Sequence, residues 1–488
     1  MDIIISVLRF IGIIFLVLMV FNVMIIVHEW GHFLAGRWRG LYIDRFQIWF
    51  GKPWLKKTVN GVQYGIGWIP AGGFVSLPQM VTMEAIEGEV PDAIKDLPPV
   101  KPIDKIIVAF AGPLFSFLLA AVFALAVWGV GRPLAEANKS TTIGYVQEES
   151  AAAKAGLQVG DTILEIDGDK IQKFRGMGNS VVWSVVSSKK EVLPFKIDRP
   201  GVGEMELSVT LPTEPESAEE EPTGMKKFFN AVFKRSPFRK IGVGPAYSAL
   251  VLETYEGSPA AKAGLLPGDE LISIDGEKVN GTNALIREFE QGYEADKPIS
   301  VVYSRGGKES TVEITPVKPL EGTEEYISKP RTGIIFNGEG RVETVHDKPH
   351  HLIGMSFQSI VRTLGAVISP KSDVKLSHLN GPVGILGVFY DLFQEPSGWK
   401  LVLWFSVVLN VNLAVLNLMP FPVLDGGHIV MAIAEWIRRK PVPIRFLEIV
   451  QTGFVLLLLS FMAFVTLKDI GDRIPGKKPP KVEVVFPS

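Results

Sequence analysis

The chain has 488 residues, a formal net charge of −2 and no cysteine. A near-neutral balance predicts no nucleic-acid partner. Without cysteine, disulfides and thiolate ligands are excluded, so a bound transition metal would need His, Asp or Glu ligands. The apolar fraction of 47% is high for a soluble protein and directs attention to membrane spans.

The N-terminal segment is apolar and long enough to cross a bilayer, which takes roughly 20 residues per helix. Only Arg9 interrupts the stretch from Ile3 to Val27. The stretch is long and no small-residue cleavage site precedes "HEWGH", so it does not match a cleavable signal peptide. We assign residues 1–36 to a first transmembrane helix.

The end of this segment carries the motif HExxH, formed by His28, Glu29 and His32. On a helix the two histidines are four residues apart and share one face. That spacing suits Zn²⁺, with Glu29 as the general base. Ionisable groups at a span are costly and indicate function; the alternative is polar residues that snorkel to the interface.

The sequence of residues 37–80 predicts a short β-hairpin. From Ile43 to Leu77 apolar residues alternate with small or polar ones, and glycines are frequent. The segment is too aromatic for an ordinary loop, and non-helical backbone enters a membrane only where protein satisfies it. We expect a re-entrant hairpin that offers an exposed edge to substrate, at Gly72, Gly73, Phe74 and Val75.

A second transmembrane helix is expected at 103–131, because Ile106–Gly131 lacks any charge. The loop that follows contains a repeat, "AKAGLQVGDTILEIDG" at Ala153–Gly168 and "AKAGLLPGDELISIDG" at Ala261–Gly276. Both copies resemble the PDZ domain, which implies β-rich domains at 135–212 and 239–320. PDZ domains bind peptides by strand addition; the alternative is two spacers with an unused groove.

The segments around the second copy are less specific. The stretch 213–238 between the domains reads as an acidic linker. The chain has "GPAY" at 244–247, so capture of a terminal carboxylate is not expected there. Residues 346–370 form an amphipathic helix, on the membrane surface or over the second domain. His350 and His351 are adjacent and do not share a helix face, so we take them as non-metal residues.

A third transmembrane helix is expected at 398–436 and a fourth at 446–468. The third carries a candidate third metal ligand, Asp425, directly after the charge-free run Leu401–Leu424. Pro420 and Pro422 break the helix there and let the chain turn a carboxylate inward. Asp425 could instead cap a helix at the membrane surface, and His428 could either hydrogen-bond near the metal or cap the turn.

Positive charges in short loops predict orientation. The loop between the third and fourth spans and the segment after the first are both basic, so both read as cytoplasmic. The tail carries an opposing signal, but we give the short internal loop more weight. The large loop with both PDZ-like domains is then extracytoplasmic, and the metal site lies towards the cytoplasmic side. The basic residues are Arg37, Arg39, Lys52, Lys56, Lys57, Arg438, Arg439, Lys440 and Arg445, against Lys468, Arg473, Lys477, Lys478 and Lys481 in the tail.

These motifs together resemble the site-2 protease family of intramembrane zinc metalloproteases. The matching features are HExxH, "AGP" at 111–113, "IPAGGFVSL" at 69–77, "NGPVGI" at 380–385 and "NLMPFPVLDGG" at 417–427. Two tandem PDZ domains narrow the resemblance to the RseP type. The fold class it implies is a membrane α-helical protein, with four transmembrane helices and a membrane-associated β-hairpin, plus two β-rich extracytoplasmic PDZ-like domains.

The resemblance implies a bacterial inner-membrane enzyme with one zinc ion per chain. His28, His32 and Asp425 would be its ligands, and Glu29 its catalytic base. Asn417 would contact the substrate backbone, and the hairpin edge would pair with the unwound substrate. Implied substrates are membrane proteins with single transmembrane segments, such as anti-sigma factors and remnant signal peptides. Ser116 departs from the pattern, since the family often has Asn there.

Two other functions remain to be weighed. A membrane-anchored PDZ scaffold with an inactive metal site would be expected to lose Glu29 first, and Glu29 is present. A metal or ion transporter would place ionisable residues near the midplane of several spans. The runs Ile106–Gly131 and Ile449–Leu467, within the second and fourth expected spans, carry none, which disfavours transport.

Overall fold

The structure, a computed structural model, describes residues 2–80, 100–212, 230, 232–440, 442–473 and 484–487. It divides into two compact units. The first comprises 1–132, 346–361 and 379–471, and the second comprises 133–345, 362–378 and 472–488. The candidate metal ligands all belong to the first unit.

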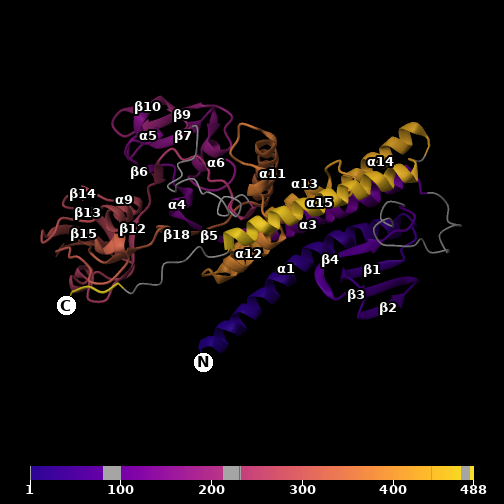
Figure 1. The fold of residues 1–488 in the computed structure, drawn as a ribbon, viewed down its shortest axis with the longest axis horizontal. Coiled ribbons are helices and arrows are strands. Elements are labelled where there is room, and N and C mark those ends of the chain that lie inside the picture. The colour runs from indigo at the N-terminus through magenta and orange to yellow at the C-terminus, as the bar shows by residue number, and fades with distance from the viewer. Residues whose placement is uncertain are drawn as a thin grey trace. The chain divides into compact units, whose positions relative to one another are not determined.

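The first unit is built from long helices around α3 (Figure 1). Helix α3 contacts α1, α13 and α14. On α3 the small residues Ala120 and Ala124 are fully buried, and small side chains let helix backbones approach closely in a membrane. The helices are α1 (Asp2–Trp38), α3 (Pro102–Val130), α12 (Pro382–Gln394), α13 (Gly398–Asn417), α14 (Asp425–Arg438) and α15 (Ile444–Arg473), with the first part of α11 (Pro349–Ile368).

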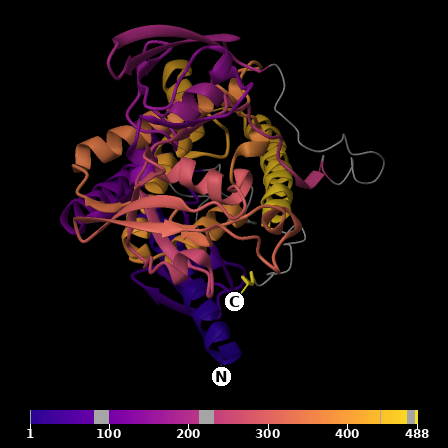
Figure 2. The same cartoon turned by 90° about the vertical axis from the view of Figure 1, so that its left-hand side faces the viewer.

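Five helices within the described residues are long and apolar enough to cross a membrane. Four of them, α1, α3, α13 and α15, coincide with the predicted spans, and the fifth is α11. Their outer surfaces carry large apolar side chains, such as Leu8 and Phe15 on α1 and Leu456 on α15. The first turns of α1 project from the other helices (Figures 1 and 2). Such surfaces suit lipid rather than water.

The expected third span, 398–436, is two helices rather than one, with the break where Pro420 and Pro422 predict it. Helix α13 ends at Asn417 and α14 begins at Asp425. Proline lacks the N–H that continues a helix, and two prolines lie in the connecting segment. The start of α14 also packs against this segment: a Cβ on Gly426 would lie 2.3 Å from the Leu418 oxygen. Only glycine permits this tight return of the chain.

The predicted hairpin at 37–80 is wrong in detail, because it is one part of a four-stranded sheet. The strands are β1 (Arg45–Phe50), β2 (Leu55–Val59), β3 (Val62–Ile66) and β4 (Ile69–Ser76), in the order β2-β3-β1-β4. Asn60 and Gly61 both have positive φ and form the tight β2–β3 turn. Strand β1 runs parallel to β3 and antiparallel to β4, so β4 lies at the sheet edge, and it packs beside α1.

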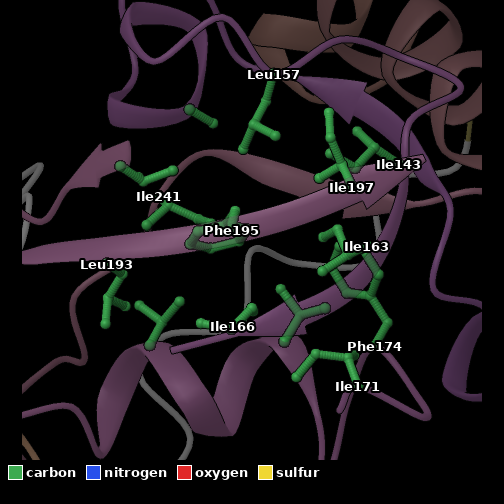
Figure 3. Close-up of a cluster of buried hydrophobic side chains, with 14 of the residues drawn as sticks. Ile143, Leu157, Ile163, Ile166, Ile171, Phe174, Leu193, Phe195, Ile197 and Ile241 are labelled. Atoms are coloured by element: carbon green, nitrogen blue, oxygen red, sulfur yellow. The ribbon is translucent and has the colours of Figure 1, made fainter. Parts of the chain in front are cut away.

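The first PDZ-like domain, in the second unit, has a core of aliphatic and aromatic side chains (Figure 3). Its larger sheet has the order β10-β9-β7-β8, and β11 pairs with β6. Alternate residues of β9, Leu193, Phe195 and Ile197, are almost fully buried, as period-two patterning requires. The elements are β5 (Arg132–Ala135), α4 (Glu136–Lys139), β6 (Ile143–Val146), α5 (Ala151–Lys154), β7 (Thr162–Ile166), β8 (Asp169–Lys170), α6 (Val181–Val186), β9 (Val192–Arg199), β10 (Gly203–Thr210) and β11 (Val243–Pro245).

The second PDZ-like domain repeats this plan, with the strand order β16-β15-β13-β12-β17 and β14 paired to β13. Its own core includes Val251, Leu271 and Phe336. The elements are β12 (Ala249–Thr254), α8 (Pro259–Lys262), β13 (Glu270–Ile274), β14 (Glu277–Lys278), α9 (Gly281–Ile286), a π-helix (Arg287–Gln291), β15 (Ile299–Arg305), β16 (Lys308–Ile314), α10 (Glu324–Ile327) and β17 (Ile334–Phe336). β18 (Val342–Val345) pairs with β5, and a 3-10 turn (Leu376–His378) follows α11.

The domain boundaries differ from the expected 135–212 and 239–320. Ile241 packs in the first core and β11 pairs with β6, so residues up to 245 complete the first domain. The second domain extends beyond residue 320, because β17 pairs with β12. Of the predicted acidic linker, 213–238, residues 213–229 and 231 lie outside the described residues.

Candidate metal centre

Two helices bring the three predicted ligands together. His28 and His32 are buried on α1, and Asp425 is the first residue of α14. The His28 Nε2 atom lies 3.3 Å from Asp425 Oδ2, and His32 Nε2 lies 3.3 Å from Asp425 Oδ1. The two Nε2 atoms are themselves 3.3 Å apart. The three side chains therefore converge on one point from positions almost 400 residues apart in sequence.

Helix α3 holds both imidazole rings by their other nitrogen. The Nδ1 of His28 lies 2.9 Å from the hydroxyl of Ser116, and the Nδ1 of His32 lies 2.8 Å from the carbonyl oxygen of Val108. The carbonyl can only accept, so His32 carries its proton on Nδ1 and leaves Nε2 free as a ligand atom. Such partners fix the tautomer and the ring orientation of metal-binding histidines.

The helices can come this close because glycine lies at the contacts. A Cβ on Gly31 of α1 would lie 2.4 Å from the carbonyl oxygen of Ala111 on α3. A Cβ on Gly112 of α3 would lie 2.2 Å from the His32 Nε2 atom. Both distances are far shorter than van der Waals contact, so each position requires a residue without a side chain. Ala111 and Gly112 of the "AGP" motif thus allow α3 to pack closely against the candidate metal ligands on α1.

Glu29 lies beside the ligands and faces the edge strand. Its Oε2 atom is buried and has no hydrogen-bond partner. The main-chain N–H of Val75 on β4 is close enough to this carboxyl group to interact with it. On the side of β4 that faces β1, the carbonyl oxygen of Ser76 accepts a hydrogen bond from the N–H of Asp44. Main-chain groups of successive residues in a strand point to opposite sides, so the N–H and C=O groups of Gly73 and Val75 point to the other, open side of β4. The strand edge that was predicted to pair with substrate therefore lies next to Glu29, the predicted general base.

The donor set fits zinc. Two imidazole nitrogens and one carboxylate oxygen are the ligand types of catalytic zinc sites, which keep a fourth position open. The two imidazole Nε2 atoms, 3.3 Å apart, have the spacing of atoms held about 2.0–2.1 Å from a tetrahedral ion, and each lies 3.3 Å from a different oxygen of the Asp425 carboxylate. Among the described residues this is the one His, Asp or Glu group spaced for a metal. His350 and His351 are exposed on α11 and take no part in it.

Asn417 is the last residue of α13, half-buried, and the segment Leu418–Leu424 joins it to Asp425. Two other asparagines of α13 were missed by the sequence reasoning. Asn410 and Asn412 each carry a buried Oδ1 atom without a partner. The available signal was three asparagines in a largely apolar stretch that carries no charge from Leu401 to Leu424. Ser116 was noted only as a departure from a pattern, although its hydroxyl contacts His28.

Membrane-spanning helices that enclose a His, His, Asp centre with a neighbouring carboxylate define a membrane metallopeptidase. The comparisons agree with this class. The model of peptidase family M50 matches residues 15–461. The chain therefore belongs to peptidase family M50, the site-2 proteases, and is a metalloprotease.

Similar proteins cover nearly the whole chain. The "Regulator of sigma E protease" of Haemophilus influenzae is 27% identical over 470 residues, covering 92% of this chain and 96% of that protein. The "Protease RseP" of Yersinia pestis is 26% identical over 474 residues, covering 92% and 96%. A solved PDZ domain of an SdrC-like protein from Listeria monocytogenes matches with 20% identity and a TM-score of 0.16, covering 18% of this chain and 88% of that one.

Proposed function

We propose that the chain is an intramembrane zinc endopeptidase that hydrolyses peptide bonds within the transmembrane segments of its substrates. The observation that carries the proposal is the buried, unpartnered Glu29 carboxylate oxygen beside three convergent ligands. A buried carboxylate oxygen without a partner is costly unless it has a task. Proton transfer to and from a reacting water and amine is such a task.

Each residue of the site then has a role in hydrolysis. A zinc ion held by His28, His32 and Asp425 would supply Lewis-acid polarisation of a carbonyl group and lower the pKa of a water molecule. Glu29 accepts a proton from the attacking water and delivers it to the leaving amine. The free edge of β4 pairs with the unwound substrate and holds it extended. Asn417 donates a hydrogen bond to the substrate backbone or the developing oxyanion.

The cellular setting follows from the same proposal. Substrates are membrane proteins with a single transmembrane segment, reached within the bilayer of a bacterial inner membrane. The family resemblance suggests anti-sigma factors and remnant signal peptides as substrate classes, and the relatives named as regulators of sigma E support the first of these. The PDZ-like domains lie outside the cytoplasm and filter or bind substrates, while the metal centre lies towards the cytoplasmic side.

The test uses the full chain reconstituted with a single-span substrate. Glu29→Gln should lower cleavage by about a hundredfold or more and keep zinc at the native stoichiometry. Asp425→Ala should lose both zinc and cleavage. Glu309→Gln, an exposed change from carboxylate to amide on β16, is the control and should behave as the native chain does. Unchanged cleavage by Glu29→Gln would refute the proposed role of Glu29 as general base.

The same measurements address the alternative of an inactive PDZ scaffold. A scaffold would show no cleavage by the native chain, and Glu29→Gln would change nothing. This alternative is disfavoured, because the chain belongs to a peptidase family and retains Glu29 with all three ligands.

A further inference from the structure

The last described residues, Val484–Pro487, here called the tail segment, pair with the second PDZ-like domain. Glu321 and Val485 form an antiparallel bridge. The N–H of Leu320 donates to the Val485 oxygen at 2.7 Å, and the N–H of Val485 donates to the Glu321 oxygen at 3.1 Å. Pairing of this kind is how an extended peptide adds to a folded domain. The tail segment is thus held by main-chain pairing at one isolated bridge, outside the sheet of the domain.

A side-chain pocket accompanies the main-chain pairing. Phe486 is only 5% exposed, and its ring centroid lies 6.1 Å from that of Tyr255. A Cβ on Gly333 would lie 3.0 Å from the Phe486 ring, so a glycine leaves room for the aromatic group. Lys262 Nζ donates to the Pro487 oxygen at 2.9 Å. Val485, by contrast, is 37% exposed, so Phe486 is the anchor of the segment.

The backbone donors at the start of β17 are already used inside the domain. The N–H groups of Thr332 and Gly333 and the hydroxyl of Tyr326 all donate to the Glu288 carboxylate, which is fully buried. A terminal carboxylate could not reach these donors without displacing Glu288. An incoming peptide is therefore recognised by strand pairing at Leu320–Glu321 and by the aromatic pocket instead.

We propose that this surface is a peptide-binding site of the second PDZ-like domain and that its ligand is the chain's own tail segment. The chemistry it recognises is an extended strand with one buried aromatic side chain. The tail segment follows α15, an apolar helix long enough to span a bilayer. Its binding therefore places the end of α15 on the same side of the membrane as the second PDZ-like domain, and it ties that domain to the helix.

Cross-linking tests the pairing in the full chain, which has no native cysteine. Residues that face each other in a hydrogen-bonded antiparallel pair have Cα atoms about 5.5 Å apart, within disulfide range. Glu321→Cys with Val485→Cys should form an intramolecular disulfide in membranes under mild oxidation. Glu309→Cys with Val485→Cys, at the far end of β16, is the control and should not. No disulfide in the first pair, or equal yields in both, would overturn the proposal.

Competition with a peptide tests the pocket. The probe is a fluorescent peptide with the sequence of residues 482–488. A tethered segment has an effective concentration of the order of millimolar, so micromolar peptide should not bind the native chain or the Val485→Ala control. In Phe486→Ala the tail segment should no longer occupy the pocket, so the fluorescent peptide should bind there. A probe with alanine in place of the phenylalanine should bind Phe486→Ala about tenfold more weakly or worse. Equal binding to all chains, or none to Phe486→Ala, contradicts the proposal.

Discussion

Gly112 offers a sharp test of the metal centre, because one methyl group at this position collides with a ligand. In the structure a Cβ there would lie 2.2 Å from His32 Nε2 and 2.5 Å from its Cε1. Normal contact needs about 3.4 Å or more, so the ring must move by roughly 1 Å. Metal sites tolerate ligand displacements of only about 0.2 Å. Gly112→Ala should therefore weaken zinc binding at least about a hundredfold, the upper range for perturbed ligand support.

The matched control is Gly129→Ala in the same helix, where a Cβ would meet nothing within 4 Å. Alanine is favoured over glycine within a helix by about 0.5–1 kcal/mol, so this change should be neutral or mildly stabilising. Zinc content measured against a graded chelator, helical circular dichroism and substrate cleavage should be followed together. We expect Gly112→Ala alone to lose zinc and cleavage while it retains its helicity. Native zinc affinity in Gly112→Ala would refute the close packing described for α3 and His32.

Three further predictions follow from single contacts. Ser116→Ala removes the partner of His28 Nδ1, so zinc affinity should fall about 10- to 100-fold; Ser116→Asn, the residue common in the family, should retain binding in the same chelator titration. Gly73→Pro deletes an N–H on the open side of β4 and should lower kcat/KM about fivefold, the value of one backbone hydrogen bond, without changing zinc content. Burial raises the pKa of the Glu288 carboxyl, and it accepts four hydrogen bonds. The folded domain then binds this proton more tightly than the unfolded chain, so stability should fall as the pH rises from the ordinary value of 4.5 through the raised pKa. Thermal melts across this range should show that slope in the native chain, and Glu288→Gln should lack it while losing about 3 kcal/mol.

The convergence of the three candidate metal ligands could be predicted from sequence, because the spacing of two of them is local and the motif of the third is strong. His28 and His32 lie on one helical face by periodicity alone. Asp425 follows a proline-broken apolar run, which marks a carboxylate turned inward from a helix end. The apolar runs likewise predicted four of the five span-length helices. In each case a single segment contains the whole signal.

The sheet and the domain boundaries required contacts between distant segments. The parallel pairing of β1 with β3 places Arg45 opposite Gln63, and alternation within 43–77 is equally compatible with a simple hairpin. Strand β11 completes a domain that begins about a hundred residues earlier. Its sequence "VGP" is short and carries no mark of its partner. Register and partner choice depend on tertiary packing, which a local pattern does not contain.

The positive charges of the tail, which oppose the predicted orientation, show the same limit of a local sequence pattern. Counting the Lys and Arg residues near a span end takes no account of how each side chain packs in the folded protein. Lys468 is only 4% exposed and lies over the Phe464 ring, with its nitrogen 5.4 Å from the centroid. A buried, ring-stacked ammonium group belongs to the packing of α15 and contributes little to orientation. Removing it from the count weakens the argument for a cytoplasmic tail, and the pairing of Val485 with Glu321 favours the side of the PDZ-like domains.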